Sequence, residues 1–207
     1  MASVIDICNS ALAHLGDSAT VASIDPPEGS AQAEHCARFY PVVLQSLLEM
    51  HDWAFATRRE LLAAVNNPST TWLYAYAKPS TSVKTLAVYS SEATDDFSGS
   101  LGPTPQDFTQ ETDSEGNILI LTNQEDAVLR HVVYVTDSTK FSPLFTRTLG
   151  WMLAGELAGP VVKGAEGARM AESCMKSAMY WFGLAAQSDA NQTQTRAQHT
   201  PTWIAAR

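Results

Sequence analysis

The acid–base chemistry open to this 207-residue chain depends first on Glu49 and Glu156. Hydrolysis of a glycosidic bond needs two carboxyl groups that flank the sugar, one of them acting as an acid. Glu49 and Glu156 come closest to that requirement, because each follows apolar residues in a segment with helical spacing. The alternative is that each lies on a polar flank of its helix or forms a salt bridge. The sequence leaves a cell-wall hydrolase open without favouring it.

Other catalytic and metal-binding patterns are missing from the sequence. Gly16-Asp17-Ser18 is similar to one lipase nucleophile block, but it follows a predicted helix rather than a strand. There is no Gly-x-Ser-x-Gly elbow, no Walker-type loop and no dinucleotide turn. No histidine pairs with a carboxylate or cysteine at metal-ligand spacing, and the segment 113–117 lacks the closing Glu of a calcium loop. We therefore expect no catalytic residue, no cofactor and no metal, and predict that the chain is not an enzyme.

The charge balance disfavours a protein that grips nucleic acid. The formal net charge is −9, whereas affinity for DNA comes mostly from Lys and Arg that neutralise phosphates. Residues 85–129 hold nine acidic residues and no Lys or Arg, which indicates either a solvated acidic lobe or an acidic surface that repels passing DNA. The pair Arg58-Arg59 allows a phosphate clamp, but Asp52 and Glu60 beside it favour local ion pairing.

Length and cysteine content indicate one sizeable body in a reducing compartment. A chain of 207 residues can bury one core with a smaller second lobe. No apolar run approaches the roughly 20 residues that span a bilayer, and the N-terminus lacks the pattern of a signal peptide. The cysteines are odd in number and lie on apolar stripes, so we expect Cys8, Cys36 and Cys174 to be buried small hydrophobes rather than a bridge or ligand set.

Apolar stripes with helical spacing predict a helical core. The predicted helices cover residues 4–15, 33–48, 58–64, 144–158 and 165–186. Ser3 can cap the first helix, with Asp6 three residues later, and Gly16 ends it. Pro41 removes a backbone donor inside the second helix, where we expect a kink.

Between the helices the period changes to that of strands. Runs rich in β-branched and aromatic residues predict strands at 73–76, 83–89, 117–121 and 128–135. Ser114–Asn117 predicts a hairpin turn, and residues 90–110 read as a long mobile loop. The fold class is therefore predicted to be mainly α with a β insertion (α+β).

These patterns divide the chain into three parts. Residues 1–66 and 143–186 are predicted to form the helical core domain, and residues 67–142 an inserted, β-rich antiparallel lobe. Residues 187–207 are mostly Gln, Thr, Asn, Ser and Ala, which predicts a flexible C-terminal tail. Trp203-Ile204 in that tail is either an interface anchor or part of a frayed terminus.

Five short segments carry the clearest family signal: Asn9–Gly16, Asp52–Arg59, Trp72–Tyr76, Ile120–Asn123 and Tyr134–Asp137. In this order they resemble the tail tubular protein A family, the head-to-tail adaptors of short-tailed phages (podoviruses). The family typically has a helix ending in Leu-Gly, a Trp-x-Phe-Ala-x-x-Arg signature and a Trp-x-Tyr-x-Tyr strand. That strand is normally followed by Leu-Pro, whereas this chain has Ala77-Lys78-Pro79, a departure that affects a turn. The similarity covers nearly the whole chain, and its strength lies in the order of the segments.

The resemblance implies a structural virion protein of the bacteriophage tail. Such an adaptor binds the portal protein, forms a ring (a dodecamer in relatives) that extends the DNA channel, and provides a platform for the downstream tail or nozzle protein. DNA would pass through the lumen without specific binding. The protein would lie in the virion after assembly and in the host cytoplasm before it, with no membrane contact.

The family's C-terminal tail reaches along the portal, which implies portal-interface candidates in the last residues here: Thr202, Trp203, Ile204 and Arg207. Two alternative functions stay open. One is a tail-associated peptidoglycan hydrolase that uses a carboxylate pair. The other is a tail-completion protein that does not bind the portal.

Overall fold

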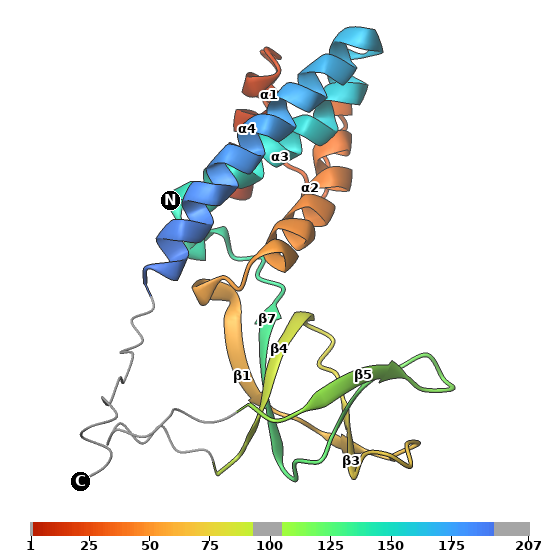
Figure 1. The fold of residues 1–207 in the computed structure, drawn as a ribbon. Helices are drawn as coiled ribbons and strands as arrows, with labels where there is room; N and C mark the ends of the chain where they lie inside the picture. The colour runs from red at the N-terminus through yellow and green to blue at the C-terminus, as the bar shows by residue number, and fades with distance from the viewer. Residues whose placement is uncertain (1, 93–104, 193–207) are drawn as a thin grey trace, which may run out of the picture. The chain divides into compact units, whose positions relative to one another are not determined.

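The computed structural model describes residues 2–92 and 105–192, and its fold is α+β, as the sequence predicts (Figure 1). The chain divides into two compact units. The helical unit comprises Met1–Thr57 and Val132–Ala190, and the body of the β unit is Arg58–His131. The units divide at 57/58 and 131/132, several residues before the divisions at 66/67 and 142/143 that the sequence patterns predict.

The helical unit is built from four helices within the described residues. They are α1 (Val4–His14), α2 (Ala31–Met50), α3 (Pro143–Val162) and α4 (Gly164–Ala190), with short 3₁₀ turns η1 (Ala54–Ala56) and η2 (Ser138–Lys140). The predicted capping box is confirmed: the Ser3 hydroxyl accepts the Asp6 N–H at 3.1 Å, and the Asp6 carboxylate accepts the Ser3 N–H at 2.8 Å. α2 is one 20-residue helix that runs through Pro41.

α3 is the central helix, because it contacts α1, α2 and α4. Its buried side chains occur all around the helix, as expected for a helix surrounded by protein. Small residues let α4 approach closely: a Cβ on Gly167 would lie 2.9 Å from the Ala158 carbonyl oxygen, and one on Gly155 would lie 3.3 Å from Met175. Gly155 and Ala158 of α3 therefore pack against α4 of the same chain.

An aromatic cluster fills the end of the helical unit. Trp53 is 1% exposed, and its indole N–H donates to the Leu47 carbonyl at 2.8 Å. Its ring makes edge contacts with Phe145 and Phe182 at centroid distances of 4.9 and 6.1 Å. All three cysteines are buried and free, as predicted.

The β unit contains two small antiparallel sheets. The strands are β1 (Thr57–Leu61), β2 (Ala64–Val65), β3 (Tyr74–Ala77), β4 (Ser82–Ser90), β5 (Phe108–Thr112), β6 (Ile118–Thr122) and β7 (Ala127–Val133). One sheet has the order β1-β7-β4 and the other β2-β3-β6-β5. Their facing side chains form one core: Leu62, Tyr76, Val88, Ile120, Ala127 and Leu129.

Three local expectations are wrong. The segment 58–64, predicted as helix from its composition, forms β1 and the start of β2, because Leu62 is buried in the β core and its N–H bonds Ala127. The predicted loop 90–110 includes the beginning of β5; its residues 93–104 lie outside the described residues. α3 continues past the predicted stop at Gly159-Pro160 to Val162.

The predicted tail also begins too early. α4 extends to Ala190, and Asp189 near its end is only 8% exposed. The Asp189 carboxylate accepts the Ala54 N–H at 3.0 Å, which holds the last turn of α4 in place. Within the part of the chain that the structure describes, no helix is both long and apolar enough to cross a membrane.

Candidate interaction groove of the β unit

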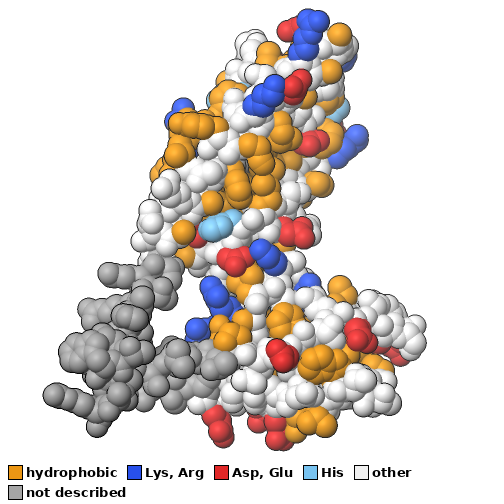
Figure 2. Space-filling model, in the orientation of Figure 1, with side chains coloured by type: hydrophobic (Ala, Val, Ile, Leu, Met, Phe, Trp, Pro, Cys, Tyr) orange, Lys and Arg blue, Asp and Glu red, His pale blue; other side chains and the backbone are white. Residues whose placement is uncertain are grey.

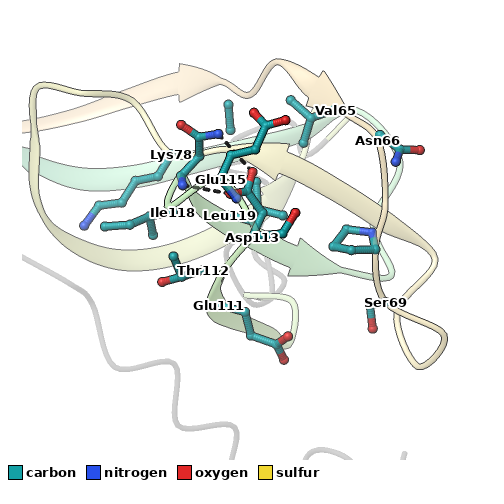
Figure 3. A pocket seen from close by; sticks show the side chains of 14 residues that line it. Val65, Asn66, Ser69, Lys78, Glu111, Thr112, Asp113, Glu115, Ile118 and Leu119 are labelled. Atoms are coloured by element: carbon teal, nitrogen blue, oxygen red, sulfur yellow. Dashed lines mark hydrogen bonds between the residues drawn. The ribbon is translucent and has the colours of Figure 1, made fainter.

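An open groove of about 680 Å³ crosses one face of the four-stranded sheet. Figure 3 shows its lining side chains, which come from the end of β2 and the β2–β3 connection, from the end of β3 and the residue after it, and from the β5–β6 hairpin. They are Val65, Asn66, Pro68, Ser69, Ala77, Lys78, Glu111, Thr112, Asp113, Ser114, Glu115, Asn117, Ile118 and Leu119. All of these residues belong to the β unit.

The floor of the groove follows from the strand register. Ala77 of β3 pairs with Leu119 of β6, and Leu119 pairs with Glu111 of β5. Directly opposed residues of antiparallel strands point to the same face, so these three side chains form one row across the sheet. The sheet face opposite the β core therefore carries two apolar residues and one carboxylate in line.

The neighbouring row on the same face is covered. Ala75 and Leu121 oppose each other, and together with Leu119 they form a small buried cluster against Trp72. The Trp72 ring therefore covers the sheet up to Leu119, and the groove begins where this cover ends. Val65 and Ile118 extend the apolar lining and are 39% and 46% exposed.

The β5–β6 turn that forms one wall is held by its own hydrogen bonds. The Asp113 carboxylate accepts the N–H groups of Glu115 and Asn117, each at 2.8 Å, and the Asn117 side-chain amide at 3.0 Å. These bonds, those from Asn117 first, lower the pKa of Asp113, so its carboxyl stays ionised at neutral pH. Gly116 supplies the positive φ, +90°, that this turn needs.

The opposite wall is equally preformed. The Asn67 side-chain amide donates to the Trp72 carbonyl at 2.7 Å, and its oxygen accepts the Ser69 N–H at 2.9 Å. A segment fixed in this way has lost its conformational entropy before a partner arrives.

The rim carries more negative than positive charge. Three carboxylates, those of Glu111, Asp113 and Glu115, line the groove together with one ammonium group, that of Lys78. Glu111 and Glu115 are exposed. Figure 2 shows acidic side chains spread over the β unit with hydrophobic side chains among them. An apolar floor with an anionic rim suits a partner that is apolar at its centre and cationic at its sides.

The lining contains no histidine or cysteine and no tightly enclosed carboxylate. Within residues 2–92 and 105–192, no group of three or more His, Cys, Asp or Glu side chains could hold a metal ion.

The structure leaves Glu49 and Glu156, the two carboxylates considered for hydrolysis, exposed on α2 and α3. A catalytic acid of a glycosidase needs an environment that keeps it protonated, usually an apolar pocket, and exposed helix positions do not supply one. Gly16 follows α1 with φ +76°. The turn predicted at Ser114–Asn117 joins β5 to β6.

Arg58 and Arg59 lie on β1. The Arg59 guanidinium sits 5.3 Å from the Tyr89 ring centroid. Glu60, expected as a partner of the arginines, lies 3.6 Å from the buried Nε2 of His131. The portal-interface candidates Thr202, Trp203, Ile204 and Arg207 lie outside the described residues.

Sequence reasoning missed the groove because its parts are far apart in the chain and become a row only through strand pairing. The available signal was the excess of acidic residues at 107–115 next to the turn at Ser114–Asn117.

The chain matches no protein-family model and none of the curated proteins.

Proposed function

We propose that this chain is a structural virion protein of a short-tailed phage: a head-to-tail adaptor that binds the portal, forms a ring that extends the DNA channel, and presents its β unit to the next tail component. The support is the ordered set of five sequence segments that resemble the tail tubular protein A family, together with the hydrogen bonds and buried side chains that residues of these segments provide in this fold.

The observation that carries the proposal is that residues of these segments fix loops and cores in both units. In the helical unit, the Asn9 side chain holds Val21 with two hydrogen bonds, of 2.7 and 3.0 Å, and Trp53 is the largest of the fully buried side chains among the described residues. In the β unit, the Asn123 side chain accepts the Leu73 N–H at 3.1 Å, and the Tyr76 hydroxyl donates to the Gln124 carbonyl at 2.9 Å. The resemblance therefore concerns residues that determine this architecture.

The charge distribution is compatible with a DNA channel. A net charge of −9 with exposed carboxylates on the β unit would repel DNA rather than retain it. The proposal assigns no catalytic residue, cofactor or metal to the chain.

The test is incorporation into phage particles of a chain that lacks residues 193–207, compared with the full chain. This deletion spares Asp189 and the rest of α4, so the truncated protein keeps the contacts that fold the helical unit. We expect a folded protein that fails to join the portal. Normal incorporation of the truncated chain would refute a portal-binding tail.

A point variant sharpens this test. Trp203→Ala is expected to weaken portal binding by at least about 2 kcal/mol, the size of an interface anchor. Thr200→Ala, in the same tail but outside the interface candidates, is the matched control, for which we expect a smaller loss. Equal, near-zero effects of both substitutions would remove Trp203 from the interface.

A further inference from the structure

The β unit has a sheet face that is only partly covered by its own chain. On this face Trp72 packs on Ala75, Leu119 and Leu121, whereas the row formed by Ala77, Leu119 and Glu111 opens into the groove. Leu119 itself is 4% exposed, so the apolar side chains that the groove leaves open are those of Val65 and Ile118, 39% and 46% exposed. Exposed apolar side chains that line a groove are typical of a surface that another chain covers.

We propose that this groove binds an extended, basic peptide segment of another protein, with aliphatic side chains against Val65 and Ile118 and Lys or Arg side chains at Glu111 and Glu115. The lining residues of the groove alone support this binding. Only the assignment of this segment to the next tail component rests on the proposed function.

The dimensions of the sheet set the length of the segment. The groove is lined from β2, at Val65, to β5, at Glu111, which means that it crosses four strands. Strands lie about 4.8 Å apart, so the crossing is about 14 Å. An extended chain spans about 3.3 Å per residue, and about four or five residues therefore fill the groove.

The excess of negative charge on the groove rim favours a partner segment that carries positive charge. The rim has three carboxylates against the single ammonium group of Lys78. The Asp113 carboxylate is engaged with the N–H groups of its own turn, which leaves Glu111 and Glu115 as the exposed carboxylates that can meet incoming cations. An acidic segment would be repelled, and a neutral apolar segment would leave these charges without partners.

The walls favour a segment that binds without remodelling the groove. Both turns are already fixed by hydrogen bonds of 2.7 to 3.0 Å, so little ordering entropy has to be lost on the side of this protein. The groove is open rather than enclosed, which predicts modest affinity for a single segment.

The test is fluorescence anisotropy with the full-length protein and a labelled peptide of about seven residues in which lysine and valine alternate. Two peptides of the same length serve as comparisons: serine–valine, which keeps the apolar side chains, and lysine–serine, which keeps the charge. We expect the lysine–valine peptide to bind with a dissociation constant in the micromolar range and each comparison peptide to bind at least about tenfold more weakly.

The double variant Glu111→Gln/Glu115→Gln should lower the affinity for the lysine–valine peptide at least about tenfold, because it removes the two exposed rim charges. Glu125→Gln is the matched control, since Glu125 is an exposed carboxylate of the same unit that does not line the groove. It should change the affinity by less than about twofold.

Three results would overturn the proposal: no binding of the lysine–valine peptide at millimolar concentration, equal binding of the serine–valine or lysine–serine peptide, or equal affinity of the double variant and the control. The assay uses the chain without portal protein. Peptide binding without portal binding would therefore support the groove proposal and contradict the adaptor proposal. Portal binding without peptide binding would support the adaptor proposal and contradict the groove proposal.

Discussion

The buried carboxylate of Asp189 makes the end of α4 a sensitive point for stability. Asp189 is 8% exposed, its two carboxylate oxygens lie 3.0 and 3.3 Å from the Ala54 nitrogen, and His51 Nε2 lies 3.3 Å from Oδ2. A hydrogen bond to a charged group contributes about 1.5 to 3 kcal/mol, and its removal also leaves the Ala54 N–H without a protein acceptor. We expect Asp189→Ala to lower the free energy of unfolding by about 2 to 3 kcal/mol.

Asp189→Asn separates charge from geometry, because the amide keeps an oxygen that can accept the Ala54 N–H. Its expected cost is about 1 kcal/mol, the difference between a charge-assisted and a neutral hydrogen bond. The assay is urea unfolding followed by tryptophan fluorescence, with the slope of the transition used to check that the unfolding reaction is unchanged. A loss below about 0.5 kcal/mol for Asp189→Ala would refute this reasoning.

A pair of truncations tests the same contact. Deletion of 188–207 removes Asp189 and should destabilise the helical unit as Asp189→Ala does, whereas deletion of 193–207 should leave its stability unchanged. Equal stability of the two truncated chains would show that the last turn of α4 contributes nothing.

Three further perturbations have defined outcomes. Trp53→Phe should lower the free energy of unfolding by about 1 to 2 kcal/mol, because the Leu47 carbonyl loses the indole N–H. Trp53→Ala should lower it by about 3 to 5 kcal/mol. Equal losses for the two variants in urea unfolding would contradict the hydrogen-bond contribution. Gly167→Ala should destabilise the protein by about 1 to 3 kcal/mol, because its Cβ would lie 2.9 Å from a carbonyl oxygen of α3. Gly183 has open space around it, so Gly183→Ala should stabilise the protein by up to about 1 kcal/mol. A change of the same sign for both variants in thermal unfolding would contradict this. Burial lowers the pKa of His131 below the usual 6.5, so the unfolded chain binds a proton at a higher pH than the folded one. The free energy of unfolding should therefore fall as the pH drops from 6.5 toward 5. His131→Gln should reduce this pH dependence, and an unchanged pH dependence would contradict the role of His131.

Local rules predicted the elements whose signals lie within a few residues. Ser3 with Asp6 predicted the start of α1, and the β6 run and its turn at Ser114–Asn117 were recognisable from composition. These features depend on hydrogen bonds between neighbours in the chain, and a single sequence contains that information.

The remainder depends on partners that are distant in the sequence. Residues 58–62 have the composition of a helix, yet pairing with β7 and burial of Leu62 determine a strand. Asp189 looked like part of a polar tail because its acceptor role requires Ala54, 135 residues away. The groove floor likewise arises from pairing of Ala77, Leu119 and Glu111, which no local pattern connects.

The most direct test of the adaptor proposal is co-sedimentation of the purified chain with purified portal rings from the same phage, with the mass of the complex measured by light scattering. The proposal predicts a stable complex that contains one copy of this chain per portal subunit. The absence of a complex at micromolar concentrations of both proteins would contradict it.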